Sequence, residues 1–475
     1  MRLPAGAEAR VVKELTKVAL GDERRTRRAC AVIAKLVRSP AASLPVMLGS
    51  DAELQGCYRL LNNRAVSMQE LLAGHIEATA ERAMKAGRVL VVHDTTECAF
   101  AHLSPKEVGY LQTGKAGFKL HVSLVLDAHA SRRPLGVVAA ETLHRASRSK
   151  RQWATKASGS ATARMEDRES QRWWRGMSAA GDALSKCDRV IHVADREGDS
   201  YELMAKLERT KQRFVIRVRT DRRARLDESD PWSPIRQIAA ACEGTLERDV
   251  PLSRRQSKAT KSMTGAHLPR TARRARLQFA ATRITIARPR YLRDEPPELM
   301  LNLVCVRELD PPPGEAAVEW LLYTTEPIDT EAQVASVVDD YRARWTIEEF
   351  NAALKTGCAY EDRELESRHA LLAMLALSLP VACEVLALRS VARMRPSAPA
   401  MDVLNEQQLQ VLRALGPHRL GAASTAREAL LAVAAIGGHL RRNGEPGWKV
   451  LQRGMTLLLA YEVGWAARSA FATMN

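Results

Sequence analysis

The chain has 475 residues, of which 46% are hydrophobic, and its formal net charge at pH 7 is +17. This length allows roughly two to four domains, and the hydrophobic content is that of a globular protein rather than a disordered one. The 72 Lys and Arg outnumber the 55 Asp and Glu, which predicts a partner that carries many phosphates.

Neither export nor membrane insertion is predicted. No uncharged apolar run approaches about 18 residues, the length that spans a bilayer. The N-terminal segment MRLPAGAEARVVKEL lacks the apolar core of a signal peptide. The eight cysteines are scattered without a C-x-x-C pair, so we predict neither a zinc site nor a disulfide framework. We therefore expect a cytoplasmic protein with no membrane partner.

Residues 1–70 are predicted to form a helical domain. Asp22 occupies the position of a helix N-cap, and Pro40 follows the expected end of that helix. The helix carries a basic cluster that includes Arg24, Arg25, Arg28 and Arg38. Such a cluster is either a solvated face or the contact surface of a DNA-end reader, and the sequence pattern fits both. A second helix is expected over residues 51–63.

The next segment predicts an α/β core. Apolar, strand-like runs begin at Arg88, Phe118, Pro134, Asp188 and Arg213, with helices expected around residues 169–186 and after Asp199. The order of three strands, helix, strand, helix, strand matches a ribonuclease-H-like core. In that core the first and fourth strands are neighbours, so Asp94 and Asp195, each predicted at a strand end, should lie side by side. An Asp at a strand end is also common in turns and caps.

Two further regions complete the predicted organisation. Residues 221–315 interrupt the core, and Arg254–Arg293 carries 12 Lys or Arg and no acid, which predicts a β-rich basic insertion that faces phosphates. Residues 373–475 are rich in Leu and Ala and are predicted to be helical. One apolar stripe there, comprising Trp448, Leu451, Met455, Leu458 and Leu459, is either core or a self-association surface.

Residues 341–355 are predicted to form one helix with two faces. At 100° per residue, Ile347, Phe350 and Leu354 cluster on an apolar side. The opposite side groups Tyr341, Arg344, Glu348 and Lys355. An acid flanked by a phenol and two cations suits a phosphodiester chain, although mixed charge along a helix is commonly just a solvated surface.

Glu348 would complete a set of three carboxylates with Asp94 and Asp195. Two Mg²⁺ ions held by such carboxylates can activate a water or a DNA 3′-hydroxyl for in-line displacement at phosphorus. Hard oxygen ligands favour Mg²⁺ or Mn²⁺ over zinc. Tyr341, Arg344 and Lys355 would hold the phosphates beside the scissile bond.

The signature Y-x2-R-x3-E-x6-K, with HDTT at Asp94 and ADRE at Asp195, resembles the DDE cut-and-paste transposases of the insertion-sequence-four family. LGDERRTRR, CYRLLNN, FVIR, WLLYTTEP and RWTIEEFNAALKTG extend the resemblance over most of the chain. The resemblance implies that Asp94, Asp195 and Glu348 are the metal-binding catalytic acids. It further implies DNA contacts by residues across the chain: Tyr341, Arg344, Lys355, Arg217, Arg24, Arg25, Arg28 and Arg38, with a flipped base stacked on Trp320 near Trp345.

The family also implies an organisation and a mechanism. A DNA-end-binding domain over 1–70, a ribonuclease-H-like catalytic domain over 71–372 and a dimerisation domain over 373–475 would act as a bacterial, nucleoid-associated synaptic homodimer. Hydrolytic nicking, hairpin formation, hairpin opening and joining to target DNA would use one active site with two Mg²⁺ ions, for which Mn²⁺ could substitute. The alternatives are a catalytically silent DNA-binding protein or inhibitor, and a nuclease that cuts without joining.

Overall fold

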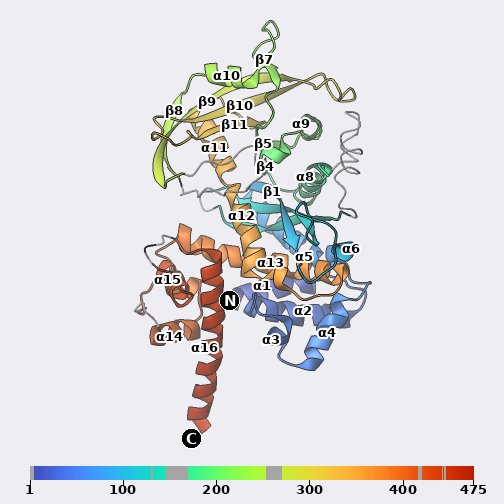
Figure 1. The fold of residues 1–475 in the computed structure, drawn as a ribbon, viewed down its shortest axis with the longest axis vertical. Helices are drawn as coiled ribbons and strands as arrows, with labels where there is room; N and C mark the ends of the chain where they lie inside the picture. The colour runs from blue at the N-terminus through green and yellow to red at the C-terminus, as the bar shows by residue number, and fades with distance from the viewer. Residues whose placement is uncertain are drawn as a thin grey trace.

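The computed structural model describes residues 5–129, 132–145, 169–252, 270–415, 420–440, 442 and 445–474. The architecture is mixed α/β. Figure 1 shows a sheet in one half of the molecule, a group of helices in the other, and the C-terminal helix projecting from the helical end.

The predicted order of the core elements is confirmed. The strands run β3-β2-β1-β4-β5 across the sheet, with β2 antiparallel to β1 and to β3, and with β4 parallel to β1 and to β5. The first and fourth strands are therefore neighbours, as expected. The core elements are β1 (Arg88–Ala99), β2 (Gly117–Asp127), β3 (Pro134–Leu143), α8 (Gln171–Ala183), β4 (Arg189–Ala194), α9 (Tyr201–Arg209) and β5 (Arg213–Arg217).

The strands that follow β5 extend this same sheet. β11 pairs antiparallel with β5, and β10 and β9 continue outward, so that one sheet of eleven strands results. The predicted insertion thus grows from the edge of the core instead of standing apart, and residues 254–269 of its basic run lie outside the described residues. The longer strands of the insertion are β8 (Leu246–Leu252), β9 (Arg273–Ala287) and β10 (Glu298–Glu308). β11 (Glu319–Thr324) follows the insertion in the chain.

The N-terminal region is helical as predicted. Asp22 caps the second helix, because its side chain accepts a hydrogen bond from the Arg24 amide. The apolar residues of that helix, such as Val32 and Leu36, are buried. The N-terminal helices are α1 (Ala5–Thr16), α2 (Glu23–Arg38), α4 (Asp51–Leu61) and α5 (Met68–Ala86).

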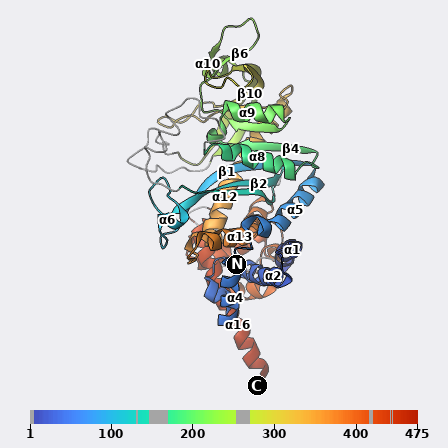
Figure 2. The same cartoon turned by 90° about the vertical axis from the view of Figure 1, so that its right-hand side faces the viewer.

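A long apolar helix, α13 (Arg368–Met394), occupies the centre of the molecule. By length and composition it could cross a membrane, but 82% of its most apolar window is buried in protein. It packs against α5, α4 and β3, and Figures 1 and 2 both place it between the sheet and the N-terminal helices. Its hydrophobicity is therefore explained by a core position.

The C-terminal residues form a smaller helical cluster. Leu451, Met455 and Leu458 are only 6%, 6% and 0% exposed, and the last two belong to a core that α16 shares with neighbouring helices. For these three residues the core interpretation of the stripe is correct. The helices are α14 (Glu406–Leu415), α15 (Ala426–Ile436) and α16 (Trp448–Met474). Short elements among the described residues include α3 (Leu44–Leu48), α6 (Pro105–Val108), η2 (Arg196–Gly198), β6 (Arg223–Arg225), β7 (Ser233–Pro234), α10 (Ile235–Ala241), η4 (Tyr360–Asp362) and η5 (Ala400–Asp402).

The prediction of one helix over 341–355 is wrong. The segment divides into α11 (Glu331–Arg342), α12 (Trp345–Ala352) and the π-helical turn η3 (Ala353–Gly357). At the junction two backbone amides donate to the carbonyl oxygen three residues earlier, as in a 3₁₀-helix. The Arg344 amide donates to Tyr341, and the Thr346 amide donates to Ala343. These tighter turns end the α-helical ladder, and the wider turn at η3 shifts the residues after Ala352 around the axis.

Arg363 joins the N-terminal region to the segment that follows η3. It is 2% exposed, and its guanidinium donates to the carbonyl oxygens of Pro40, at 2.5 Å, of Ala42, and of Cys358, at 2.8 Å. A buried cation of this kind is stable only while its donors are satisfied. Two of these acceptors, Pro40 and Ala42, belong to the N-terminal region, so Arg363 is one of the side chains that join the two regions.

We predict that Arg363→Met lowers the free energy of unfolding by about 3 kcal/mol, because buried carbonyl oxygens lose a charged donor. Thermal denaturation of the variant should show a lower Tm than wild type. The matched control is Arg64→Met, which removes an exposed arginine. Equal Tm values for the two variants would contradict the role given to Arg363.

A second buried polar group links α1, α5 and β3. Glu14 accepts from His75 Nδ1 at 2.6 Å and from Arg82 at 2.5 Å, and His75 Nε2 accepts from the Val137 amide at 3.1 Å. Burial alone would raise the pKa of Glu14, but the bonds and charges of His75 and Arg82 outweigh it and lower that pKa. The ionised form of Glu14 is therefore the one that the fold stabilises.

Because the pKa of Glu14 is lower in the folded state, its stabilisation is present above the unfolded value of 4.5 and is lost as the pH falls below it. We expect Glu14→Gln to lower the Tm clearly at pH 7 and to differ little from wild type near pH 3. Melting curves across this range measure the difference. A Tm gap that widens toward acid pH would refute this account.

Candidate active site

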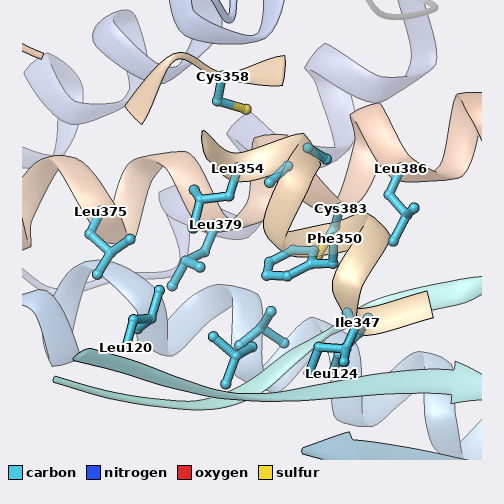
Figure 3. Packing of buried hydrophobic residues seen from close by; sticks show 14 of the residues in the cluster. Leu120, Leu124, Ile347, Phe350, Leu354, Cys358, Leu375, Leu379, Cys383 and Leu386 are labelled. Atoms are coloured by element: carbon cyan, nitrogen blue, oxygen red, sulfur yellow. The ribbon is translucent and has the colours of Figure 1, made fainter. Parts of the chain in front are cut away.

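Helix α12 is fixed by its apolar face. Ile347 and Phe350 of α12, and Leu354 of the η3 turn that follows it, are each 0% exposed, and Figure 3 shows them packed among Leu120 and Leu124 of β2 and the leucines of α13. The prediction of this apolar side is confirmed. Burial of such side chains contributes about 2 kcal/mol each, which holds the opposite side of the helix in place.

Asp94 and Asp195 lie where the parallel pairing of β1 and β4 ends. The last paired residues of this ladder are Val92 and Val193. The prediction that β1 ends at Asp94 is wrong, because β2 continues to pair with β1 and Asp94 lies opposite Val122 within the strand. Asp195 follows β4 and accepts from the Glu197 amide at 2.8 Å as the cap of η2. Both acids thus lie two residues beyond the last paired residues of the β1–β4 ladder.

The pKa of Asp94 depends on the charge of Glu348 as well as on that of Asp195. The pKa of Asp94 is raised to about 7, chiefly by burial, with Asp195 and Glu348 adding to the rise and the Thr95 backbone and Arg344 opposing it. Like charges disfavour ionisation only at short range. Asp94 therefore lies within electrostatic range of Asp195 and Glu348, and the assignment of the three acids to one catalytic site stays a prediction.

Glu348 is paired with a cation of its own segment. Arg344 donates to Glu348 at 2.5 Å, and this bond, opposed by burial, raises the pKa of Arg344. Within the described residues, no three His, Cys, Asp or Glu side chains are gathered closely enough to hold one metal ion as they stand. The Arg344 guanidinium donates to Glu348, and the Glu197 amide donates to Asp195. Metal binding by Glu348 would therefore require the Arg344–Glu348 hydrogen bond to break. The donor set itself, three carboxylates with one of elevated pKa, fits a hard divalent cation.

Lys355 lies in the π-helical turn and is oriented by two acceptors. It donates to the Glu97 carbonyl oxygen, and its ammonium is 3.6 Å from the Glu361 carboxylate. Glu361 in turn accepts from the Ala99 amide at 2.8 Å. These contacts place Lys355 beside the β1 segment that follows Asp94, one turn of chain from α12.

Tyr341 does not share an exposed face with Glu348, contrary to the single-helix prediction. It belongs to α11, is 6% exposed, and packs edge-on against Trp320 with 5.7 Å between ring centroids. Its phenol contributes to the raised pKa of Arg344, so its polar end lies near that cation. Trp320 is half-buried beside it.

Trp345, by contrast, is 59% exposed. Trp345 is therefore not a core residue, and a large apolar ring at the start of α12 is open to solvent. An exposed indole is the kind of surface on which a nucleic acid base stacks.

Arg217 lies at the end of β5 and donates to the Glu319 carbonyl oxygen at 3.3 Å. Burial, followed by the charges of Arg217 and Arg236, lowers the pKa of Arg196. The charges of Arg217 and Arg236 therefore reach Arg196, the residue that follows Asp195 in the chain. Sequence reasoning found only Arg217, although Arg196 was visible within the DRE motif.

Asn351 was also missed. Its amide nitrogen donates to Asp94 at 3.3 Å, while its side-chain oxygen is buried without a hydrogen-bond partner. Its position, three residues after Glu348, places both side chains on one side of α12. That spacing was the available signal, but an Asn in a helix carries little information alone.

Helix α2, which carries the predicted arginines, lies on the other side of α13 from β1 and β4 in Figures 1 and 2. Arg24 is exposed. Arg25 donates to the Leu20 carbonyl oxygen at 3.0 Å, and Arg28 lies over Gly56 of α4. Arg38 is engaged in an ion pair with Glu8, at 2.5 Å. The cluster therefore contains both exposed and internally bonded members.

The fold and the acid cluster beside arginines are those of an enzyme that acts on a phosphodiester backbone. Comparison with protein-family models gives the family. Residues 177–381 match the Transposase DDE domain, and residues 8–66 match the Transposase DNA-binding model. The chain is a DDE transposase, an enzyme that binds and cleaves DNA.

DDE domains have a ribonuclease-H-like core and generally use divalent metal ions. Asp195 and Glu348 lie within the matched residues, whereas Asp94 precedes them. The inclusion of Asp94 in the site therefore depends on the strand pairing and on its electrostatic contact with the other two acids.

We predict that Trp345→Ala leaves the Tm within about 1 °C of wild type, because surface substitutions change stability little. DNA cleavage should nevertheless weaken, by an amount equivalent to about 1–3 kcal/mol for a lost base stack. Tm and the cleavage rate of an end-containing duplex are the two measurements. The control is Trp345→Phe, which keeps an aromatic surface, and equal loss in both variants would contradict stacking.

Proposed function

We propose that this transposase is a cut-and-paste enzyme of the insertion-sequence-four family, in which it resembles the transposase of transposon five. The observation that carries the proposal is the gathering of Asp94, Asp195 and Glu348 from three separate segments, close enough for two to raise the pKa of the third. Three acids beside a phosphate-binding surface disfavour the alternative of a silent DNA-binding protein, which has no use for their mutual repulsion.

The three carboxylates would hold two Mg²⁺ ions, for which Mn²⁺ would substitute. When bound, such ions supply Lewis-acid activation of a water or a DNA 3′-hydroxyl and stabilise the leaving oxygen. Asn351 would keep the Asp94 carboxylate oriented through its amide bond. Arg344 would exchange its bond to Glu348 for a DNA phosphate, because a guanidinium binds either anion through the same planar fork.

The neighbouring residues would orient the DNA. Lys355, held by Glu97 and Glu361, presents an ammonium to a phosphate near the acids. Arg217 and Arg196 would contact the strand beside Asp195, and a base flipped from the duplex would stack on Trp345 and Trp320. The buried Tyr341 would support the DNA-contacting side chains from the protein interior, by packing against Trp320 and by interacting with Arg344.

The proposed reaction starts at the inverted repeats of the transposon ends, which the N-terminal domain would recognise with α2. A nick frees a 3′-hydroxyl, which attacks the opposite strand to give a hairpin. Hairpin opening yields a blunt end whose 3′-hydroxyl joins target DNA. These cleavage and joining reactions would take place within a synaptic homodimer, in the cytoplasm of a bacterium and in association with the nucleoid.

The test uses a labelled duplex that spans a transposon end, incubated with protein and Mg²⁺ and resolved on a denaturing gel. We expect a nick at the end boundary, followed by a hairpin-length product, for wild type. Glu348→Gln should lower the cleavage rate at least a thousandfold while leaving end binding intact.

The matched control is Glu331→Gln, an exposed acid at the start of α11, which should cleave as wild type does. Cleavage that persists in Glu348→Gln would overturn the proposed role of α12. Binding without cleavage by wild type in both Mg²⁺ and Mn²⁺ would favour a silent DNA-binding protein.

A further inference from the structure

A buried arginine beneath the site, Arg172, has no part in the chemistry described above. It lies in the first turn of α8, and its side chain is 8% exposed. Its guanidinium makes three bonds in different directions: to Thr95 Oγ1 at 2.7 Å, to the Glu169 carbonyl oxygen at 2.7 Å and to Glu197 Oε2 at 2.6 Å. A buried cation costs several kcal/mol unless its donors are satisfied, so such a placement requires a reason.

The two side-chain partners of Arg172 adjoin the two acids of the sheet. Thr95 follows Asp94 directly, and Glu197 is two residues after Asp195. Each partner also contacts its acid through the backbone. The Glu197 amide donates to Asp195 at 2.8 Å, and the Thr95 backbone makes a hydrogen bond to the Asp94 carboxylate. One guanidinium therefore holds both residues whose amides orient the acids.

This connection spans a gap in the sheet. The parallel ladder of β1 and β4 ends at Val92 and Val193, before either acid. At this point the side chains of His93, one residue beyond the ladder, and His192, one residue before its end, also meet, with Nε2 and Nδ1 2.9 Å apart. Beyond the ladder no backbone bond between β1 and β4 fixes the distance from Asp94 to Asp195. Arg172 supplies a connection at this level.

We infer that Arg172 is a positioning residue, which sets the spacing of the Asp94 and Asp195 carboxylates for divalent cations by tying Thr95 to Glu197. The inference rests on the proposed function, in which these two acids hold metal ions. The planar fork of arginine matters here, because lysine is a point charge and cannot bond in three fixed directions.

The test measures Mn²⁺ binding by the full-length protein without DNA, by electron paramagnetic resonance of free Mn²⁺. Arg172→Met and Arg172→Lys should each raise the dissociation constant for Mn²⁺ by about 10–100-fold, the usual effect of a lost supporting contact. The matched control is Arg175→Met, an arginine on the same helix that pairs with Glu141 at the surface, and it should bind Mn²⁺ as wild type does.

Two milder variants keep the test independent of folding. Glu197→Gln alters an acid that is 57% exposed, and Thr95→Val removes only the hydroxyl. Both should weaken Mn²⁺ binding, whereas Thr95→Ser keeps the hydroxyl that bonds Arg172 and His121 and should bind as wild type does. The double variant Arg172→Met with Thr95→Val should lose less than the sum of the two single losses, because the two side chains share one hydrogen bond.

The outcomes separate this inference from the proposed function. If Asp94→Asn abolishes Mn²⁺ binding while Glu197→Gln and Arg172→Lys bind as tightly as wild type, Arg172 is merely structural and the inference is wrong. If Asp94→Asn itself leaves Mn²⁺ binding unchanged, the proposed metal site is wrong. A lower Tm for Arg172→Met with unchanged Mn²⁺ affinity would likewise overturn the inference.

Discussion

Burial of the apolar side of α12 and η3 against β2 and α13 is the interaction on which the candidate site depends. Asp94, Asp195 and Glu348 come from three separate segments, and their proximity is unfavourable unless positive charge is near. Arg344 provides part of that charge through its bond to Glu348, and burial of the apolar side of α12 against β2 and α13 opposes the tendency of the acids to separate. The packing of an entire helix thus maintains an arrangement that electrostatics alone would disperse.

Local sequence patterns predicted the parts of the site that depend on local physics. The Asp22 cap, the apolar side formed by Ile347, Phe350 and Leu354, and the order of the core strands all follow from short-range rules. The adjacency of Asp94 and Asp195 followed from strand order, because parallel neighbours in such a core are fixed by topology. These features needed no knowledge of distant contacts.

What sequence could not predict depends on tertiary contacts. The break at Ala343 and the π-helical turn are backbone adjustments that helical periodicity does not reveal, and they bury Tyr341 instead of exposing it. Asp94 lies within β1 because the partner strand β2 is long. Arg172 and Asn351 act on residues 77 and 257 positions away along the chain. No local motif identifies a partner at such a separation.

The bonds of Arg363 have a consequence for how transposases of this architecture diversify. Its acceptors in the N-terminal region are the backbone oxygens of Pro40 and Ala42, and every amino acid carries a backbone oxygen. These two acceptors therefore stay the same whichever side chains occupy positions 40 and 42, whereas contacts such as Arg10 with Glu384 and Asn62 with Ser367 depend on the side chain. The part of the attachment that Arg363 supplies thus tolerates sequence change at its acceptor positions in the DNA-binding domain.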